Sequence, residues 1–210
     1  MRTVFLIGNL ASGKSTAARY LASKGARHID LDDMAKSLYV PGSELVEALA
    51  QEFGCQILDE AGGVRFGELA RRAFVTSEST QRLNDIVHPV VRQRLSDMLM
   101  PVQCCSTVVP QFPLTVVEVS VPSACSDMFP LGDDVIAIYA PLEARRERAI
   151  ARGMAPDDFE ARAAVQPDDE KICDFATVVI DNSAADDSLF RSLDAYLIEH
   201  AIDFSNCEAE

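Results

Sequence analysis

A phosphate-binding loop near the N-terminus constrains this chain more than any other feature of its sequence. Residues 8–16 read GNLASGKST and fit the pattern G-x-x-x-x-G-K-[ST], between an apolar run and a helical pattern. Glycines let the backbone wrap closely around phosphate, and backbone N–H groups and the helix N-terminus then point at the anion. The sequence therefore predicts a nucleoside triphosphate site, and this loop alone does not separate a kinase, an ATPase and a GTPase.

Two residues of the loop have separate expected roles in binding the nucleotide. We expect Lys14 to reach the β- and γ-phosphates and Ser15 to hold Mg²⁺. No N-K-x-D motif occurs in the sequence, which disfavours a regulatory GTPase. The ATP-binding residues predicted in the loop are Gly8, Asn9, Leu10, Ala11, Ser12, Gly13, Lys14, Ser15 and Thr16.

Short apolar runs alternate with longer helical patterns along the rest of the chain. Strands are expected at 3–7, 27–30, 115–121, 135–139 and 177–180. Each run is nearly all apolar, as in strands that are buried on both faces of a parallel sheet. Helices are expected at 14–24, 43–53, 67–75, 79–100, 142–152, 156–165 and 186–200. The alternation predicts an α/β fold of the P-loop NTPase type, with a five-stranded parallel sheet flanked by helices.

The spacing of the strands predicts how this single domain of 210 residues is organised. Residues from about 33 to 100 look purely helical, which is too long for an ordinary crossover and suggests an inserted helical subdomain at the carboxyl edge of the sheet. The core is then expected at about 1–32, 101–144 and 174–210, and a small lid at about 145–173. The segment 101–113 contains three prolines, so an irregular loop is favoured there over a short strand at 107–109.

Charge and cysteine content narrow the class of protein. The chain has 33 acidic and 19 basic residues and a formal charge of −14, which disfavours a general binder of nucleic acid or of anionic membranes. The six cysteines form no C-x-x-C pair, and we interpret them as reduced thiols rather than a metal site or a disulfide framework. No apolar run reaches the ~18 residues that a membrane span needs. We expect a cytoplasmic protein.

The second expected strand ends in a carboxylate, Asp30, and two more follow it, Asp32 and Asp33. The end of a parallel strand places them at the carboxyl edge of the sheet, near the phosphate loop. A small-molecule kinase needs a carboxylate there to orient the acceptor hydroxyl and to accept its proton. We favour Asp32 for this role and Asp33 as the N-cap of the following helix; in the alternative, the acidic residues serve only the helix N-terminus.

A cluster of arginines lies on the helix expected at 142–152. Arg145, Arg148 and Arg152 are spaced i, i+3 and i+7 and therefore share one helix face. Phosphoryl transfer builds negative charge that cationic side chains offset, and an arginine-rich lid supplies such side chains when it closes. The alternative is a solvated helix whose own glutamates pair with the arginines. We assign Arg148 and Arg152 to the nucleotide and Arg146 to the solvated face.

The sequence resembles the dephospho-CoA kinase family, which carries out the last step of coenzyme A synthesis, over nearly the whole chain. The resemblance rests on short motifs that are weak alone and fairly specific in this order and spacing. They are the phosphate loop at 8–16, IDLD at 29–32, PG at 41–42, FG at 53–54, LN at 83–84 followed by HP at 88–89, Arg148 with Arg152, Gln166, and IDN at 180–182.

The resemblance implies transfer of the γ-phosphate of ATP to the ribose 3′-hydroxyl of dephospho-CoA, with Mg²⁺ as the cofactor. It makes Asp32, Lys14 and Arg148 the catalytic residues and places Asn182 near the adenine. The helical insertion would bind the acceptor, and the implied acceptor-binding residues are Asp32, Arg65, His88 and Pro122. Read without the resemblance, His88 lies just before Pro89 and is equally consistent with a ligand contact, a helix break or a packed core residue.

Parts of the chain depart from the family pattern. PSACS at 122–126 replaces the family's P-L-L-x-E, and PDDE at 167–170 stands where the family usually has basic residues. Phe66 occupies the place of a family arginine, for which the adjacent Arg65 is the substitute. These departures leave two alternatives, a P-loop kinase for another small hydroxyl acceptor and a nucleotide-binding homologue with impaired catalysis.

Overall fold

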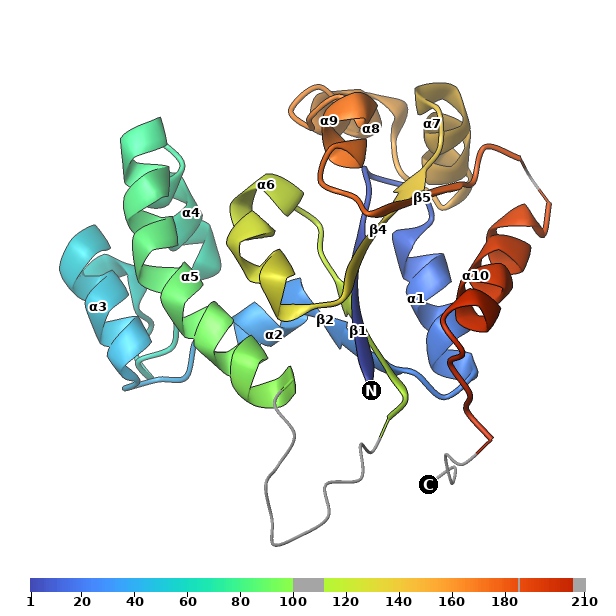
Figure 1. Cartoon of the computed structure of the whole chain (residues 1–210). Coiled ribbons are helices and arrows are strands. Elements are labelled where there is room, and N and C mark those ends of the chain that lie inside the picture. Colours follow the sequence, from blue (N-terminus) through green and yellow to red (C-terminus); the bar gives the residue numbers. More distant parts are fainter. Residues whose placement is uncertain (100–111, 185, 206–210) are drawn as a thin grey trace, which may run out of the picture. The chain divides into compact units, whose positions relative to one another are not determined.

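The five-stranded parallel sheet predicted from the sequence is confirmed by a computed structural model, which describes residues 1–99, 112–184 and 186–205 (Figure 1). Its strand order is β2-β3-β1-β4-β5, and the strands are β1 (Arg2–Ile7), β2 (Arg27–Asp30), β3 (Leu114–Glu118), β4 (Asp134–Tyr139) and β5 (Val178–Asp181). β3 ends three residues earlier than predicted, because the chain turns away to enter a short helix at Pro122. The expected loop at 101–113 lies mostly outside the described residues. The alternative strand at 107–109 lies wholly outside them.

Helices flank the sheet. They are α1 (Lys14–Ser23), α6 (Pro122–Cys125), α7 (Leu142–Ala151), α8 (Pro156–Ala163), α9 (Asp169–Cys173) and α10 (Ser188–Glu199), with a 3-10 helix η2 (Ser126–Leu131). Sequence analysis missed α6, α9 and η2 because each is too short to show a helical period. Within the described residues, no helix combines the length and the apolarity that crossing a bilayer requires.

The centre of the sheet is buried on both faces, which explains why β1 is apolar at successive positions. Val4 and Leu6 point to the face that α1 and α10 cover, and Phe5 and Ile7 point to the other face. All four side chains are fully buried. The loop that follows β1 therefore starts from a rigid, completely enclosed strand.

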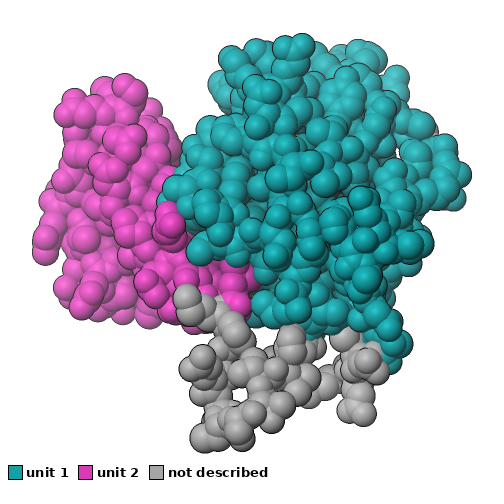
Figure 2. Space-filling view, viewed as in Figure 1, with its two compact units in different colours: residues 1–31, 101–210 teal, residues 32–100 magenta. Residues whose placement is uncertain are grey.

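Residues 32–100 form a compact unit separate from residues 1–31 and 101–210 (Figure 2). The helices of this segment are α2 (Leu31–Ser37), α3 (Glu44–Phe53), η1 (Cys55–Ile57), α4 (Phe66–Ala73) and α5 (Ser77–Leu99). The prediction of a purely helical segment is wrong at one place, because Leu58 and Val64 form an antiparallel β-bridge. Asp59 closes the turn between them by accepting hydrogen bonds from the amides of Ala61 and Gly63.

Helix α5 continues through Pro89, so the interpretation of His88 and Pro89 as a helix break is wrong. Proline removes one backbone hydrogen bond from a helix and strains the preceding turn. Here the helix is held by a buried apolar stripe on both sides of the proline. The stripe consists of Leu83, Val87, Val91, Leu95 and Leu99.

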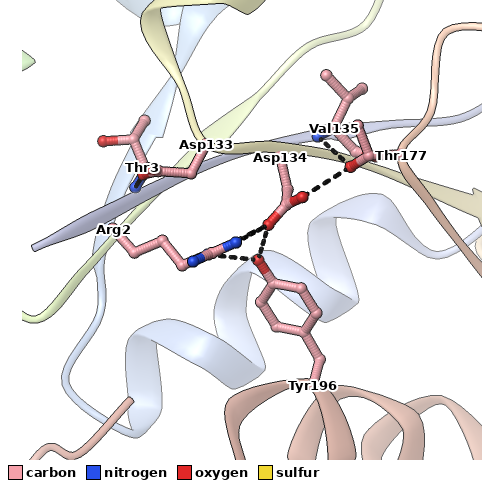
Figure 3. A network of polar contacts seen from close by, with 7 residues as sticks. All are labelled: Arg2, Thr3, Asp133, Asp134, Val135, Thr177 and Tyr196. Carbon is pink, nitrogen blue, oxygen red and sulfur yellow. Dashed lines mark hydrogen bonds and ion pairs between the residues drawn. The ribbon is translucent and has the colours of Figure 1, made fainter. Parts of the chain in front are cut away.

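A polar network ties Tyr196 of α10 to Arg2 and Asp134, the first residues of β1 and β4 (Figure 3). Because the phosphate loop follows the last residue of β1, this network lies at the opposite edge of the parallel sheet. The carboxylate of Asp134 accepts hydrogen bonds from Tyr196 (2.6 Å), from Thr177 (2.9 Å) and from the Arg2 guanidinium (2.5 Å). Burial alone raises the pKa of Asp134, but the bonds from Tyr196, Arg2 and Thr177 outweigh it and hold that pKa below its usual value.

This network predicts a specific acid sensitivity of folding. A depressed pKa in the folded state stabilises the protein above the unfolded pKa of about 3.9, and that stabilisation is lost as the pH falls through the folded value. Asp134→Asn should lower the free energy of unfolding by about 1–3 kcal/mol near neutral pH, since it removes charge-assisted hydrogen bonds. Urea unfolding of the wild type and the variant, measured from about pH 7 to about pH 3, should give curves that converge in acid. Curves that stay parallel would contradict this account, and Asp157→Asn on the exposed surface of α8 serves as the control.

Candidate active site

The phosphate loop joins β1 to α1 and has the backbone shape that its glycines predict. Gly8 and Gly13 adopt φ values of +148° and +115°, which favour glycine. A Cβ atom at Gly13 would lie 2.4 Å from Nδ2 of Asn182, so no larger residue fits there. Ala11 also adopts a positive φ of 60°, at a cost of about 1 kcal/mol.

Asn182 braces this loop from the end of β5. Its side-chain Nδ2 donates a 2.7 Å hydrogen bond to the carbonyl oxygen of Ser12, and its own carbonyl accepts a 2.7 Å bond from Nη2 of Arg148. Arg148 donates a second bond, of 3.1 Å, to the carbonyl of Ala184. Asn182 thus connects the phosphate loop with the arginine helix.

A cavity of about 230 Å³ lies where these elements meet. Two arginines and one aspartate, Asp186, supply its charged lining, and Phe190 and Leu189 give it an aromatic and apolar wall. Such a mixture suits a nucleoside with its phosphates. Four residues predicted to bind ATP line it, together with the predicted catalytic residue Arg148; the four are Gly13, Thr16, Arg152 and Asn182.

Sequence analysis missed Glu118, which ends β3 beside the phosphate loop. Its carboxylate accepts a 2.6 Å hydrogen bond from the hydroxyl of Ser15 and lies 3.2 Å from Nε2 of His28 on β2. Burial raises the pKa of Glu118, but the hydrogen bonds from His28 and Ser15 and the charge of Lys14 together lower it. The carboxylate is therefore ionised at neutral pH. The feature of the sequence that could have indicated Glu118 is that it is the only charged residue of the strand LTVVE and its last one.

The pair formed by Ser15 and Glu118 fits the chemistry of Mg²⁺, which prefers oxygen donors. Within the ranges that the structure describes, no group of three His, Cys, Asp or Glu side chains is arranged to hold a metal ion. Mg²⁺ in phosphoryl-transfer sites is usually held by one or two carboxylates together with substrate phosphates. One hydroxyl and one ionised carboxylate beside a phosphate loop are therefore a suitable donor set.

The two candidate aspartates lie in the first turn of α2, and both are exposed. The prediction that Asp33 is the N-cap is wrong, because α2 already begins at Leu31, directly after β2. Asp33 instead forms an ion pair of 2.9 Å with Lys36 on the surface of the same helix. Asp32 lies two residues beyond the last residue of β2.

The residues implied for the acceptor are placed as follows. Arg65 is exposed directly before α4, and His88 is half-buried on α5. Pro122 is buried at the first position of α6. Phe66, at the place of the family arginine, makes an edge-on contact with Tyr39 at a centroid distance of 5.2 Å.

The arginines of α7 separate into different environments. Arg145 is 4% exposed, and its Nε donates a 3.0 Å bond to the carbonyl of Ala140. Arg146 pairs with Glu160 of α8 at 2.8 Å rather than with a glutamate of its own helix. Only Arg148 and Arg152 of this helix line the cavity. The shared face predicted from the spacing therefore contains one structural arginine and two at the site.

Comparisons with known proteins show which family the chain belongs to. The sequence profile of the dephospho-CoA kinase family matches residues 2–187. A dephospho-CoA kinase from Corynebacterium diphtheriae is 37% identical over 192 residues, covering 91% of this chain and 93% of that protein. The dephospho-CoA kinase of Mycolicibacterium paratuberculosis is 34% identical over 98% of the chain, which spans 49% of that longer protein. The crystal structure of TT1252 from Thermus thermophilus superposes with a TM-score of 0.73 and 29% identity over 94% of this chain and 97% of that one. The chain, with its P-loop kinase fold and its family match over most of its length, belongs to the dephospho-CoA kinase family.

Proposed function

We propose that this protein transfers the γ-phosphate of ATP to the ribose 3′-hydroxyl of dephospho-CoA, giving coenzyme A and ADP. The observation that carries the proposal is a phosphate loop with its lysine and serine in place, in a chain that belongs to this family. Membership supplies the acceptor, and the cavity beside the loop supplies a place for the nucleotide.

In the proposed reaction, the 3′-oxygen of the ribose attacks the γ-phosphorus, and the bond to the β-γ bridging oxygen breaks as ADP leaves. Asp32 orients the hydroxyl and accepts its proton. Lys14 and Arg148 offset the negative charge that builds on the transferred group. The backbone of residues 8–16 holds the phosphates, and Arg152 adds positive charge at the nucleotide cavity.

Mg²⁺ is the proposed cofactor, and it supplies charge neutralisation at the β- and γ-phosphates when bound. Ser15 would hold it, and Glu118 would help because its carboxylate already lies 2.6 Å from the Ser15 hydroxyl. Asn182 braces the loop beside the nucleotide.

The remaining parts of the chain are assigned to the acceptor and to closure. The helical segment 33–100 would bind dephospho-CoA through Arg65 and His88, with Pro122 contributing from the core. The segment 145–173 would act as a lid over the nucleotide. We also propose that the protein works in the cytoplasm, where reduced cysteines such as the thiols of Cys55 and Cys173 persist.

The experiment that tests this function is an assay of ATP consumption with and without dephospho-CoA. Turnover that dephospho-CoA stimulates and that a chelator of divalent metals abolishes is the expected result. Turnover with another hydroxyl acceptor alone would instead establish the alternative kinase, and tight ATP binding without any turnover would establish the impaired homologue. Either result would overturn the proposal.

A further inference from the structure

The first turn of the phosphate loop is held by a segment that lies more than 150 residues away in the sequence. Asn9, which is 4% exposed, donates through Nδ2 to the carbonyl of Pro167 (3.1 Å) and to Oδ1 of Asp169 (2.6 Å). The backbone N–H of Leu10 donates to Oε1 of Gln166 at 2.9 Å. We call these five residues the clamp.

The clamp is anchored on its other side by a buried cation. Nη2 of Arg145 lies 3.3 Å from both carboxylate oxygens of Asp169, and Nε of Arg145 is bonded to the carbonyl of Ala140 just after β4. The side chain of Arg145 is 5% exposed. Asp169 is thus fixed to the sheet by an ion pair and to the phosphate loop by a hydrogen bond.

Separating the clamp would leave several buried polar groups without partners. Asn9 and Arg145 are both buried, and Nη1 of Arg145 already has no hydrogen-bond partner within the described residues. Each further unsatisfied buried group is unfavourable, so the arrangement in which the clamp contacts are formed is preferred over one in which they are separated. It also gives a local reason for the acid at position 169, where the family pattern usually has basic residues.

We propose that Asn9, Gln166 and Asp169 are positioning residues for phosphoryl transfer, because they fix the first turn of the phosphate loop through the clamp. Catalysis by a phosphate loop depends on positioning together with electrostatic stabilisation, and a displacement of about 1 Å is enough to reduce a rate by about 10²-fold. The clamp acts on the backbone that precedes Lys14 and touches neither the cavity nor Glu118. This inference rests on the proposed kinase reaction for its kinetic consequence.

The test compares Asn9→Ala and Asp169→Ala, alone and combined, with Asp168→Ala. Asp168 is the matched control, because it is the adjacent carboxylate, its side chain is 82% exposed, and it pairs with Lys171 at the surface. Each clamp variant should lower kcat/KM for ATP about tenfold and leave KM for the acceptor unchanged. The double variant should lose no more activity than the more damaging single variant, since both substitutions remove the same bond between Asn9 and Asp169. Asp169→Asn keeps an oxygen for Asn9 and should recover most of the loss.

Hydrogen exchange gives a second readout that does not depend on the acceptor. Amides of residues 8–12 should exchange about tenfold faster in Asn9→Ala and in Asp169→Ala than in Asp168→Ala. If the clamp has a purely structural role, the variants should have a lower melting temperature, while their kcat/KM and loop exchange stay at the control values. That result would overturn the proposal. Additive losses in the double variant would overturn it as well. Asn9→Ala leaves the pair of Arg145 and Asp169 intact, so it remains informative if Asp169→Ala fails to fold. If dephospho-CoA does not stimulate ATP turnover by the wild type, the proposed function is refuted. The hydrogen exchange of the loop amides would still test the clamp in that case.

Discussion

Lys14→Ala should reduce kcat/KM for ATP by about 10²–10³-fold and weaken nucleotide binding as well. The lysine lies at the start of α1, directly after the glycine that the loop geometry requires. A P-loop lysine interacts with the β- and γ-phosphates in both the ground state and the transition state, so its loss affects binding and rate together. Steady-state kinetics and titration with a fluorescent ADP analogue measure the two effects separately.

Lys24→Ala is the matched control for this prediction. It removes the same charge from the other end of the same helix, where Lys24 pairs with Asp194 at 2.9 Å on the surface. This variant should stay within about twofold of the wild type, since surface ion pairs contribute little. If Lys14→Ala retained wild-type turnover, the loop at 8–16 would not be the nucleotide site.

The parts of the fold that the sequence predicted are those in which a local pattern carries the information. The phosphate loop was predicted because Gly8, Gly13 and Lys14 must recur at fixed spacing wherever a backbone wraps a phosphate. The strands were predicted because burial on both faces demands uninterrupted apolar runs, as in β1. Asp33 was assigned wrongly by the same kind of reasoning, since the start of a helix is uncertain by one or two residues.

The contacts that the sequence did not reveal join residues far apart in the chain. Glu118 meets Ser15 across about 100 residues, and Asp169 meets Asn9 across about 160 residues. Neither acid belongs to a motif, and in the sequence Asp169 is indistinguishable from its exposed neighbour Asp168. The pair of Glu118 and Ser15 becomes visible only when the order of strands in the sheet is known, because that order brings the ends of β1 and β3 together. The pair of Asp169 and Asn9 becomes visible only in the folded chain, which places residues 166–169 beside the loop after β1.

Asp32→Asn should lower kcat by about 10²-fold or more and leave the affinity for ATP nearly unchanged. The substitution keeps the size of the side chain and removes its ability to accept a proton from the acceptor hydroxyl. An effect on kcat without an effect on nucleotide binding is the signature of a group that acts in the transition state. Single-turnover measurements with saturating ATP and dephospho-CoA isolate the transfer step from product release.

Asp33→Asn provides the matched control for this prediction. Asp32 and Asp33 are adjacent, both are exposed, and both lie in the first turn of α2, so each carboxylate interacts similarly with the helix dipole. Neutralising Asp33 removes its surface pair with Lys36 and should change kcat less than about threefold. If both variants lose activity equally, the helix N-terminus needs negative charge in general. If neither loses activity, another group accepts the proton. A large loss confined to Asp32→Asn is the one result that assigns the base to a single carboxylate.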